Sequence, residues 1–205
     1  MDTAGPKPKR VLVAAVHADG RNESSLGFVA SMLRLQIELL KVATPIQVEV
    51  VFFPSAAAAL TAGKAHDVVC VLDTFVGFPP ELITRAMASG HDVVVGVVPL
   101  PGMDWERVAK IARAGDDAEP LSTAGVRYNV TPTAALGNGY WRFDVDAAKR
   151  AASKTVAVLT AAGLDAFAAH GIAAPGAAVD LDAPCSVLAQ LGFEGCVGHR
   201  GRVLR

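Results

Sequence analysis

The sequence predicts an α/β protein with a mostly parallel sheet and helices on both of its faces. Short runs of β-branched apolar residues alternate along the chain with longer helical segments, which is the order of a βαβ protein. The run from Val68 to Leu72 is continuous rather than alternating, as expected for a strand buried on both faces. With 205 residues and 52% hydrophobic composition, the chain is large enough to bury one substantial core. We therefore expect residues 1–10 to be a flexible tail and residues 11–205 to be a single domain.

The first half of the chain gives the clearest pattern. Ser24 and Ser25 precede an amphipathic segment from Leu26 to Leu40, which predicts a capped helix. A second helix is expected to begin near Pro80, because proline is tolerated in the first helical turn, and to end at Gly90. The strands expected in this half are Val11 to Val16, Gln47 to Phe53, Val68 to Leu72 and Asp92 to Val98.

The second half gives a weaker pattern. The periodicity fades between Glu119 and Gly139, where Gly125, Pro132, Gly137 and Gly139 predict a long irregular loop, and long loops in compact domains are often functional. A strand is expected from Tyr140 to Val145. The helices expected in this half are Trp105 to Ala114, Asp146 to Ala162 and Leu164 to His170.

Composition excludes several classes of function. The net charge of −1 and a pI near 6.5 argue against a nucleic-acid partner, which needs a clustered basic face. No run of apolar residues is long enough for a membrane span, and the N-terminus lacks the order of a signal peptide. The expected setting is therefore intracellular, in a host cytoplasm, or inside a virus particle if the protein is viral. A dinucleotide-binding enzyme is disfavoured because no G-x-G-x-x-G follows the first strand.

Polar residues follow two of the predicted strands directly. Asp73 ends the strand that begins at Val68, and open α/β sheets bind ligands at this edge. We consider three roles for it: a lone metal ligand, a ribose contact or a capping residue. His17 and Asp19 follow the first strand. They either contact a nucleotide or form an ordinary turn.

Five short segments in the middle of the chain carry a family resemblance. They are Leu72-Asp73, Gly77-Phe78-Pro79, Asp92-Val93-Val94-Val95-Gly96, Pro99 and Asp104-Trp105-Glu106-Arg107-Val108. Their order resembles that of the small GT-A fold glycosyltransferases of large DNA viruses, phages and bacteria. The resemblance covers most of the chain and is strongest between Val68 and Val108. It implies a GT-A fold, a Rossmann-like fold for nucleotide-diphospho-sugar transfer, with His17, Asp19 and Asp73 binding the nucleotide sugar.

The metal site that the resemblance implies is incomplete. In the family, an Asp-x-Asp pair holds Mg²⁺ or Mn²⁺ against the diphosphate of the donor. Here the corresponding residues are Asp73-Thr74-Phe75, and Pro101 stands where the family has a lysine. Asp73 is thus expected to be a vestigial metal ligand, with either no cofactor or weakly bound Mn²⁺ or Mg²⁺.

Further site residues follow from the C-terminal half of the resemblance. Asp180 and Asp182 lie where the family has its acidic pair, and Asp182 is our first choice for the catalytic base that takes the acceptor proton. The alternative for Asp182 is a helix N-cap before Pro184. Tyr140 and Trp141 either line an acceptor site, by stacking on sugar rings, or serve as packing anchors.

Two functions remain open on the sequence alone. One is a glycosyltransferase-like domain with a degenerate metal site, which transfers sugar from a nucleotide to an unknown acceptor. The other is a catalytically inactive descendant that serves as a structural or interaction protein, for example in a virus particle, with protein partners. Retained fold motifs do not separate them, because folding alone would preserve such motifs.

Overall fold

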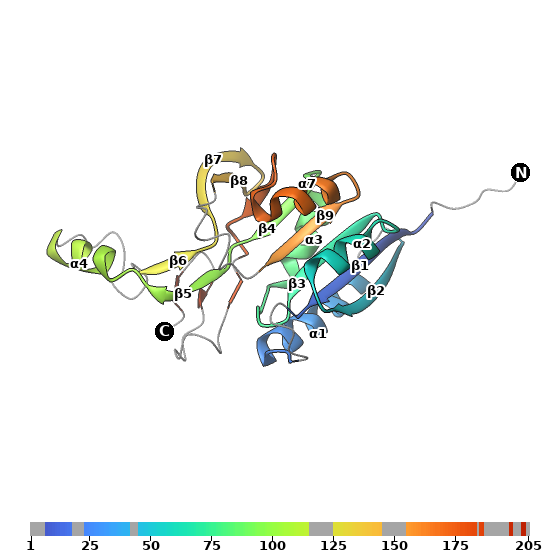
Figure 1. Ribbon diagram of the computed structural model, residues 1–205, viewed down its shortest axis with the longest axis horizontal. Coiled ribbons are helices and arrows are strands. Elements are labelled where there is room, and N and C mark those ends of the chain that lie inside the picture. Colours follow the sequence, from blue (N-terminus) through green and yellow to red (C-terminus); the bar gives the residue numbers. More distant parts are fainter. Residues whose placement is uncertain are drawn as a thin grey trace, which may run out of the picture.

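The protein is built around one large mixed sheet, seen in a computed structural model that describes residues 7–17, 23–41, 45–114, 125–144, 155–183, 185–186, 197–198 and 202–203. The sheet has eight strands in the order β2-β1-β3-β9-β4-β10-β8-β7 (Figure 1). The strands are β1 (Lys9–Val16), β2 (Ile46–Phe53), β3 (Val68–Asp73), β4 (Val93–Gly96), β7 (Thr131–Gly137), β8 (Tyr140–Asp144), β9 (Val156–Thr160) and β10 (Ala178–Asp180).

The strand directions make the sheet mixed, with most strands running one way. β2, β1 and β3 are mutually parallel, and β4 is parallel to β10. β9 runs antiparallel to both of its neighbours, β3 and β4, and β8 runs antiparallel to β10 and β7. Only β9 and β8 therefore oppose the other six strands. The predicted α/β class, with helices on both faces of the sheet, is confirmed.

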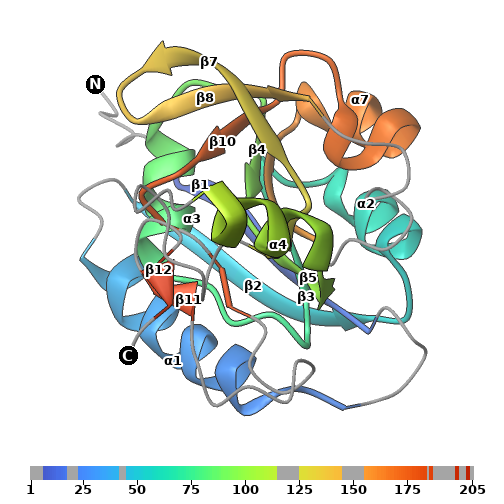
Figure 2. The same ribbon diagram turned by 90° about the vertical axis from the view of Figure 1, so that its left-hand side faces the viewer.

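Helices cover the two faces of the sheet in pairs. α1 (Leu26–Leu40) and α3 (Pro80–Ala88) pack on one face, whereas α2 (Ala56–Gly63) and α7 (Gly163–His170) pack on the other (Figures 1 and 2). Successive residues of a strand point to opposite faces. Val11, Val13 and Ala15 of β1 accordingly join the core under α1, and Leu12 and Ala14 join the core under α2.

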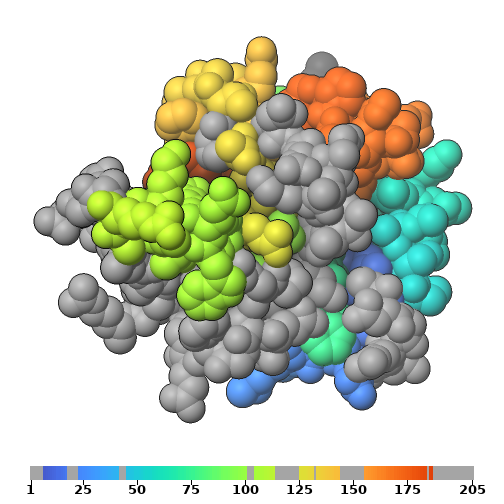
Figure 3. All heavy atoms as spheres, turned by 60° about the vertical axis from the view of Figure 1, so that its left-hand side comes forward, coloured from blue at the N-terminus to red at the C-terminus, as the bar shows by residue number. Residues whose placement is uncertain are grey.

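Several smaller elements lie outside the main sheet. β5 (Pro99–Met103) pairs with β6 (Val126–Tyr128), and α4 (Trp105–Ala114) stands out from the body beside them (Figure 1). We call β5, β6 and α4 the excursion. Figure 3 shows α4 on the surface below β7 and β8. The remaining described elements are the single turn η1 (Gly171–Ala173) and the two short strands β11 (Val197–Gly198) and β12 (Arg202–Val203), which pair with each other.

A buried asparagine ties this excursion to the main sheet. Asn129, fully buried, accepts the Val98 amide through Oδ1 at 2.8 Å and donates from Nδ2 to the Gly96 carbonyl at 3.1 Å. Its own amide donates to the Val98 carbonyl at 3.0 Å. These bonds satisfy backbone groups that would otherwise be buried without partners just after β4.

Several predicted elements were wrong. Residues 156–160 were expected to be helical but form β9, a central strand, while residues 146–154 lie outside the described part of the chain. The predicted loop from Glu119 to Gly139 contains β6 and β7, and residues 119–124 are not described. β1 begins at Lys9, inside the expected tail. The sequence analysis also missed α2, β5 and β10. No helix among the described residues has the length and apolar character needed to cross a membrane.

Candidate functional site

The strand registers bring the predicted site residues to one edge of the sheet. Leu72 lies opposite Ala15 and Val156, which places the ends of β1 and β3 in the same row. Continuing along this row, β4 ends at Gly96 opposite Asp180 of β10. β3 and β10 are separated by β9 and β4, so their ends lie roughly 14 Å apart at the usual spacing of strands. The edge therefore carries two groups of residues rather than one.

The first group ties the end of β1 to the end of β3. The Thr74 hydroxyl donates to the Glu23 carbonyl at 3.1 Å and lies 3.3 Å from His17 Nδ1. His17 Nδ1 itself lies 3.2 Å from the same carbonyl, so a proton on Nδ1 satisfies both contacts. The Ser25 amide donates to the Thr74 carbonyl at 2.8 Å. This network fixes the segment that leads into α1.

Asp73 belongs to the same group and forms a turn. Its Oδ1 accepts the Phe75 amide at 2.8 Å, and its own amide donates to the Thr155 carbonyl at 2.8 Å. Aspartate commonly stabilises turns by bonding the backbone two residues on. The capping role is therefore realised in the structure. The side chain is only 3% exposed.

An aromatic surface, missed by the sequence analysis, adjoins this group. The Phe52 ring at the end of β2 stacks on the His17 ring, with centroids 5.4 Å apart and planes 19° apart. Phe52 nevertheless remains 55% exposed. The sequence carried a signal for it, because Phe52 and Phe53 are adjacent in a strand and must point to opposite faces. Asp19 lies outside the described residues.

The second group is centred on a buried ion pair. Asp180 is fully buried, and its Oδ2 lies 2.9 Å from Nε of Arg85, which reaches across from α3. Its Oδ1 accepts the Asp182 amide at 3.0 Å. The Asp182 carboxylate, whose side chain is half exposed, lies 3.7 Å from Arg85 Nη1. Sequence reasoning missed Arg85, because a polar residue in the last turn of a helix usually faces solvent.

Tyr140 completes this second group. The Arg85 guanidinium lies 5.8 Å from the centre of the Tyr140 ring, and the His91 ring lies 5.1 Å from it. Burial, and then the negative charge of Asp180, raise the pKa of the Tyr140 hydroxyl above its ordinary value of 10.0. Trp141, the next residue along β8, packs against the core on the other face of the sheet. The two aromatic residues predicted for an acceptor site therefore point to opposite faces.

The predicted carboxylates do not converge either. Asp73 follows Leu72, whose side chain is in the core under α1, so Asp73 faces the α2 side at the end of its strand. Asp180 alternates with Val179 of the α2-side core and faces α3. Among the described residues, no three His, Cys, Asp or Glu side chains are grouped so that they could hold a metal ion.

Several residues that carry the family resemblance have packing roles in this structure. Phe78 is buried, its amide donates to Ser31 Oγ at 2.9 Å, and its ring meets Phe28 edge-on. A Cβ added to Gly96 would lie 2.9 Å from Cys185 Sγ, so the glycine is required by close packing. Asp104 caps α4 by accepting an amide at 3.0 Å through its Oδ1.

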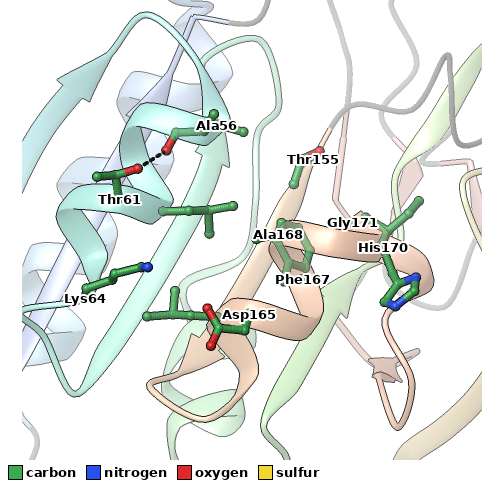
Figure 4. A pocket seen from close by; sticks show the side chains of 13 residues that line it. Ala56, Thr61, Lys64, Thr155, Asp165, Phe167, Ala168, His170 and Gly171 are labelled. Atoms are coloured by element: carbon green, nitrogen blue, oxygen red, sulfur yellow. Dashed lines mark hydrogen bonds between the residues drawn. The ribbon is translucent and has the colours of Figure 1, made fainter.

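A cavity of about 500 Å³ lies between α2 and α7 on the other face (Figure 4). Its walls are mostly apolar, while Thr61, Lys64, Asp165 and His170 are exposed. One end reaches Thr155, the residue whose carbonyl accepts the Asp73 amide. Ligand sites usually combine an apolar cavity with a few convergent polar groups, and these four side chains are spread over two helices.

Comparison with models of known protein families gave no match, and comparison with curated proteins gave none either.

Proposed function

We propose that this protein is a glycosyltransferase-like domain that binds a nucleotide sugar at the carboxyl ends of β1 and β3. The strand order β2-β1-β3 carries the proposal. The chain leaves β1 through α1 to reach β2 on one side, and returns through α2, on the opposite face, to reach β3 on the other side. Open α/β sheets bind their ligands in the crevice at such a switch point. His17, Asp73 and Thr74 lie at this position.

The chemistry of the first group fits a nucleotide. The exposed Phe52 ring, backed by His17, offers a flat apolar surface on which a base can stack. α1 begins nearby at Leu26, and the positive end of a helix favours a phosphate. A single carboxylate, that of Asp73, gives a divalent cation fewer ligands than an Asp-x-Asp pair. We therefore expect nucleotide binding to depend weakly on Mn²⁺ or Mg²⁺.

Asp182 is the better candidate for the catalytic base. Its side chain is half exposed, whereas Asp180 is fully buried and paired with Arg85. A base must reach the acceptor hydroxyl within hydrogen-bond distance, and a carboxylate sealed under a helix cannot do so. Asp180 then acts as a positioning residue, because its Oδ1 holds the Asp182 amide.

The separation of the two groups favours the second candidate function, an inactive structural or interaction protein. A transferase brings donor and base within contact of one sugar carbon, yet Asp73 and Asp180 end strands roughly 14 Å apart and face opposite sides of the sheet. A nucleotide sugar is long enough to bridge part of this distance. Binding and turnover must therefore be tested separately.

The test begins with calorimetric titration of UDP, GDP and their sugars, with and without Mn²⁺. Micromolar binding supports the donor site, and the Phe52→Ala variant should then bind about 10-fold more weakly, because stacking on an aromatic ring contributes on the order of 1–3 kcal/mol. The exposed Trp105→Ala on α4 is the matched control and should bind normally. Binding without hydrolysis or transfer of the sugar supports the inactive descendant. No binding of any nucleotide overturns the first proposal.

A second variant tests the metal site. Phe75→Asp restores the missing carboxylate beside Asp73 and should raise the Mn²⁺ affinity of the nucleotide complex, whereas Phe75→Asn should raise it much less, because hard cations prefer charged oxygen ligands. Equal affinities for wild type and Phe75→Asp would count against an intact diphosphate pocket.

A further inference from the structure

α1 has two apolar faces, although a helix that packs on a sheet needs only one. Its core face is formed by Phe28, Met32, Leu35 and Leu39. A second stripe, which we call the outer stripe, consists of Leu26, Val29, Leu33, Ile37 and Leu40, which are 85%, 43%, 59%, 56% and 86% exposed. Their spacings of three or four residues place them on one side of the helix. A helix that packs on a sheet normally exposes a polar face to solvent, so a second apolar stripe indicates a second contact.

The outer stripe lies on the flank of α1 that is turned away from α3. On the opposite flank, Ser31 accepts the Phe78 amide from the turn that leads into α3, and Gly27 lies against Gly77 of the same turn. At 100° per residue, Leu33 lies well over 90° around the helix from both Gly27 and Ser31. The stripe therefore faces outward and towards β2.

β2 extends this apolar surface. Val48, Val50 and Phe52 are 37%, 40% and 55% exposed, and their partners in β1 belong to the core under α1, so all three side chains stand on the α1 face. β2 ends the order of the sheet, and no described strand pairs with its outer edge. Of the residue types that commonly protect edge strands from pairing with another chain, it contains one charged residue, Glu49, and neither proline nor lysine.

The exposed apolar side chains of both elements are symmetrically spaced. In α1, the exposed residues 26, 29, 33, 37 and 40 are separated by the same intervals on both sides of Leu33. An antiparallel two-fold arrangement therefore sets Leu26 against Leu40, Val29 against Ile37 and Leu33 against itself. In β2, the same operation about Val50 sets Val48 against Phe52. A surface that is its own complement under two-fold rotation is the requirement for a closed dimer.

We propose that a second copy of this chain covers the outer stripe. In the dimer, β2 pairs antiparallel with β2 of the partner, and α1 packs antiparallel against α1 of the partner on the same face of the joined sheet. In this arrangement one two-fold axis, perpendicular to the sheet, relates both contacts, because α1 and the exposed side chains of β2 are on the same face.

The exposed apolar surface supplies more than half of the area that a partner would cover. The eight exposed side chains of the outer stripe and β2 together expose the equivalent of between four and five whole residues. At roughly 100 Å² of apolar area per large side chain, they supply on the order of 450 Å² per copy. A stable interface buries about 800 Å² per partner, and paired backbone and flanking side chains add to the apolar part. None of the eight side chains carries a charge, and Glu49 of β2 lies on the other face of the sheet.

Sedimentation equilibrium over a wide range of concentrations tests the dimer. Wild type should dimerise, and Leu33→Glu or Val50→Lys should raise the dissociation constant by about 100-fold or more, because each places two like charges at the axis. Ala62→Glu adds the same charge to an exposed position of α2, on the other face, and should have no effect. Circular dichroism checks that each variant is folded. A monomeric wild type, or a dimer unaffected by Leu33→Glu and Val50→Lys, overturns the proposal.

Cysteine cross-linking tests the antiparallel arrangement. In a Cys196→Ser background the other two cysteines, Cys70 and Cys185, are buried. Leu33→Cys should then form a disulfide-linked dimer on mild oxidation, because Leu33 faces its own copy. Leu26→Cys alone should not, whereas Leu26→Cys with Leu40→Cys should. Equal cross-linking by Leu33→Cys and by Leu26→Cys alone would refute the two-fold arrangement.

Discussion

Removal of the Arg85 guanidinium should destabilise the protein more than the loss of an exposed ion pair would. Arg85→Leu leaves the Asp180 carboxylate fully buried without its cation. At 2.9 Å and an effective dielectric constant near 20, the attraction between the two charges is on the order of 6 kcal/mol. The arginine side chain is 36% exposed, so solvent offsets part of this energy. Since breaking buried pairs costs 3–5 kcal/mol, we expect a loss of about 3 kcal/mol, or roughly 6–12 °C in Tm.

Urea denaturation followed by circular dichroism measures this loss. Arg34→Leu, which removes an exposed arginine from α1, is the matched control and should change the free energy of unfolding by less than about 0.5 kcal/mol. Asp180→Asn removes the charge that Arg85 balances. In the Asp180→Asn variant, Arg85→Leu should therefore lower the free energy of unfolding by at least about 1.5 kcal/mol less than it does in wild type. Equal costs in both backgrounds would refute the ion pair as the cause.

Three further predictions concern stability. Gly96→Ala should cost about 1–3 kcal/mol in thermal unfolding, because the new methyl group meets Cys185 Sγ; an unchanged Tm would contradict the packing argument. Asn129→Ala should cost about 2–3 kcal/mol in urea denaturation, because two buried backbone groups lose their partners, and a loss below about 0.5 kcal/mol would show that water replaces the side chain. The raised pKa of Tyr140 stabilises the fold below pH 10, and this contribution should disappear as the pH rises through the folded-state pKa. Ultraviolet titration checks it, since Tyr140→Phe leaves only Tyr128 to ionise; a Tyr140 pKa at or below 10 would be the contrary result.

The elements predicted correctly are those whose signals are local. The apolar face of α1 repeats with the helical period and follows the cap Ser25, whose Oγ accepts the Phe28 amide at 3.1 Å. β9 was missed because Val156 to Leu159 is a short apolar run without period, preceded by alanine and lysine. Its identity as a strand depends on β3 and β4, which lie far away in the sequence and pair with both of its edges.

The same distinction explains the predictions about the site. The position of Asp73 at the sheet edge follows from the strand that precedes it, and the structure places it there. The role of Arg85 depends on the partner Asp180, which is distant in sequence and belongs to a strand too short to give a pattern. The opposite orientations of Tyr140 and Trp141 follow from strand alternation, once residues 140–144 are known to form a strand of the main sheet.

Phe52 belongs both to the proposed nucleotide site and to the proposed dimer interface, and this overlap has a measurable consequence. A base stacked on the Phe52 ring and the partner's Val48 would compete for the same exposed surface. Nucleotide should therefore weaken dimerisation, and dimerisation must weaken nucleotide binding by the same factor, because coupling between two binding equilibria is reciprocal. Sedimentation of wild type with saturating nucleotide measures the first effect, and titration of the monomeric Leu33→Glu variant against wild type measures the second. If both constants are unchanged, the base does not stack on the exposed side of Phe52, and the dimer and the nucleotide site occupy separate surfaces.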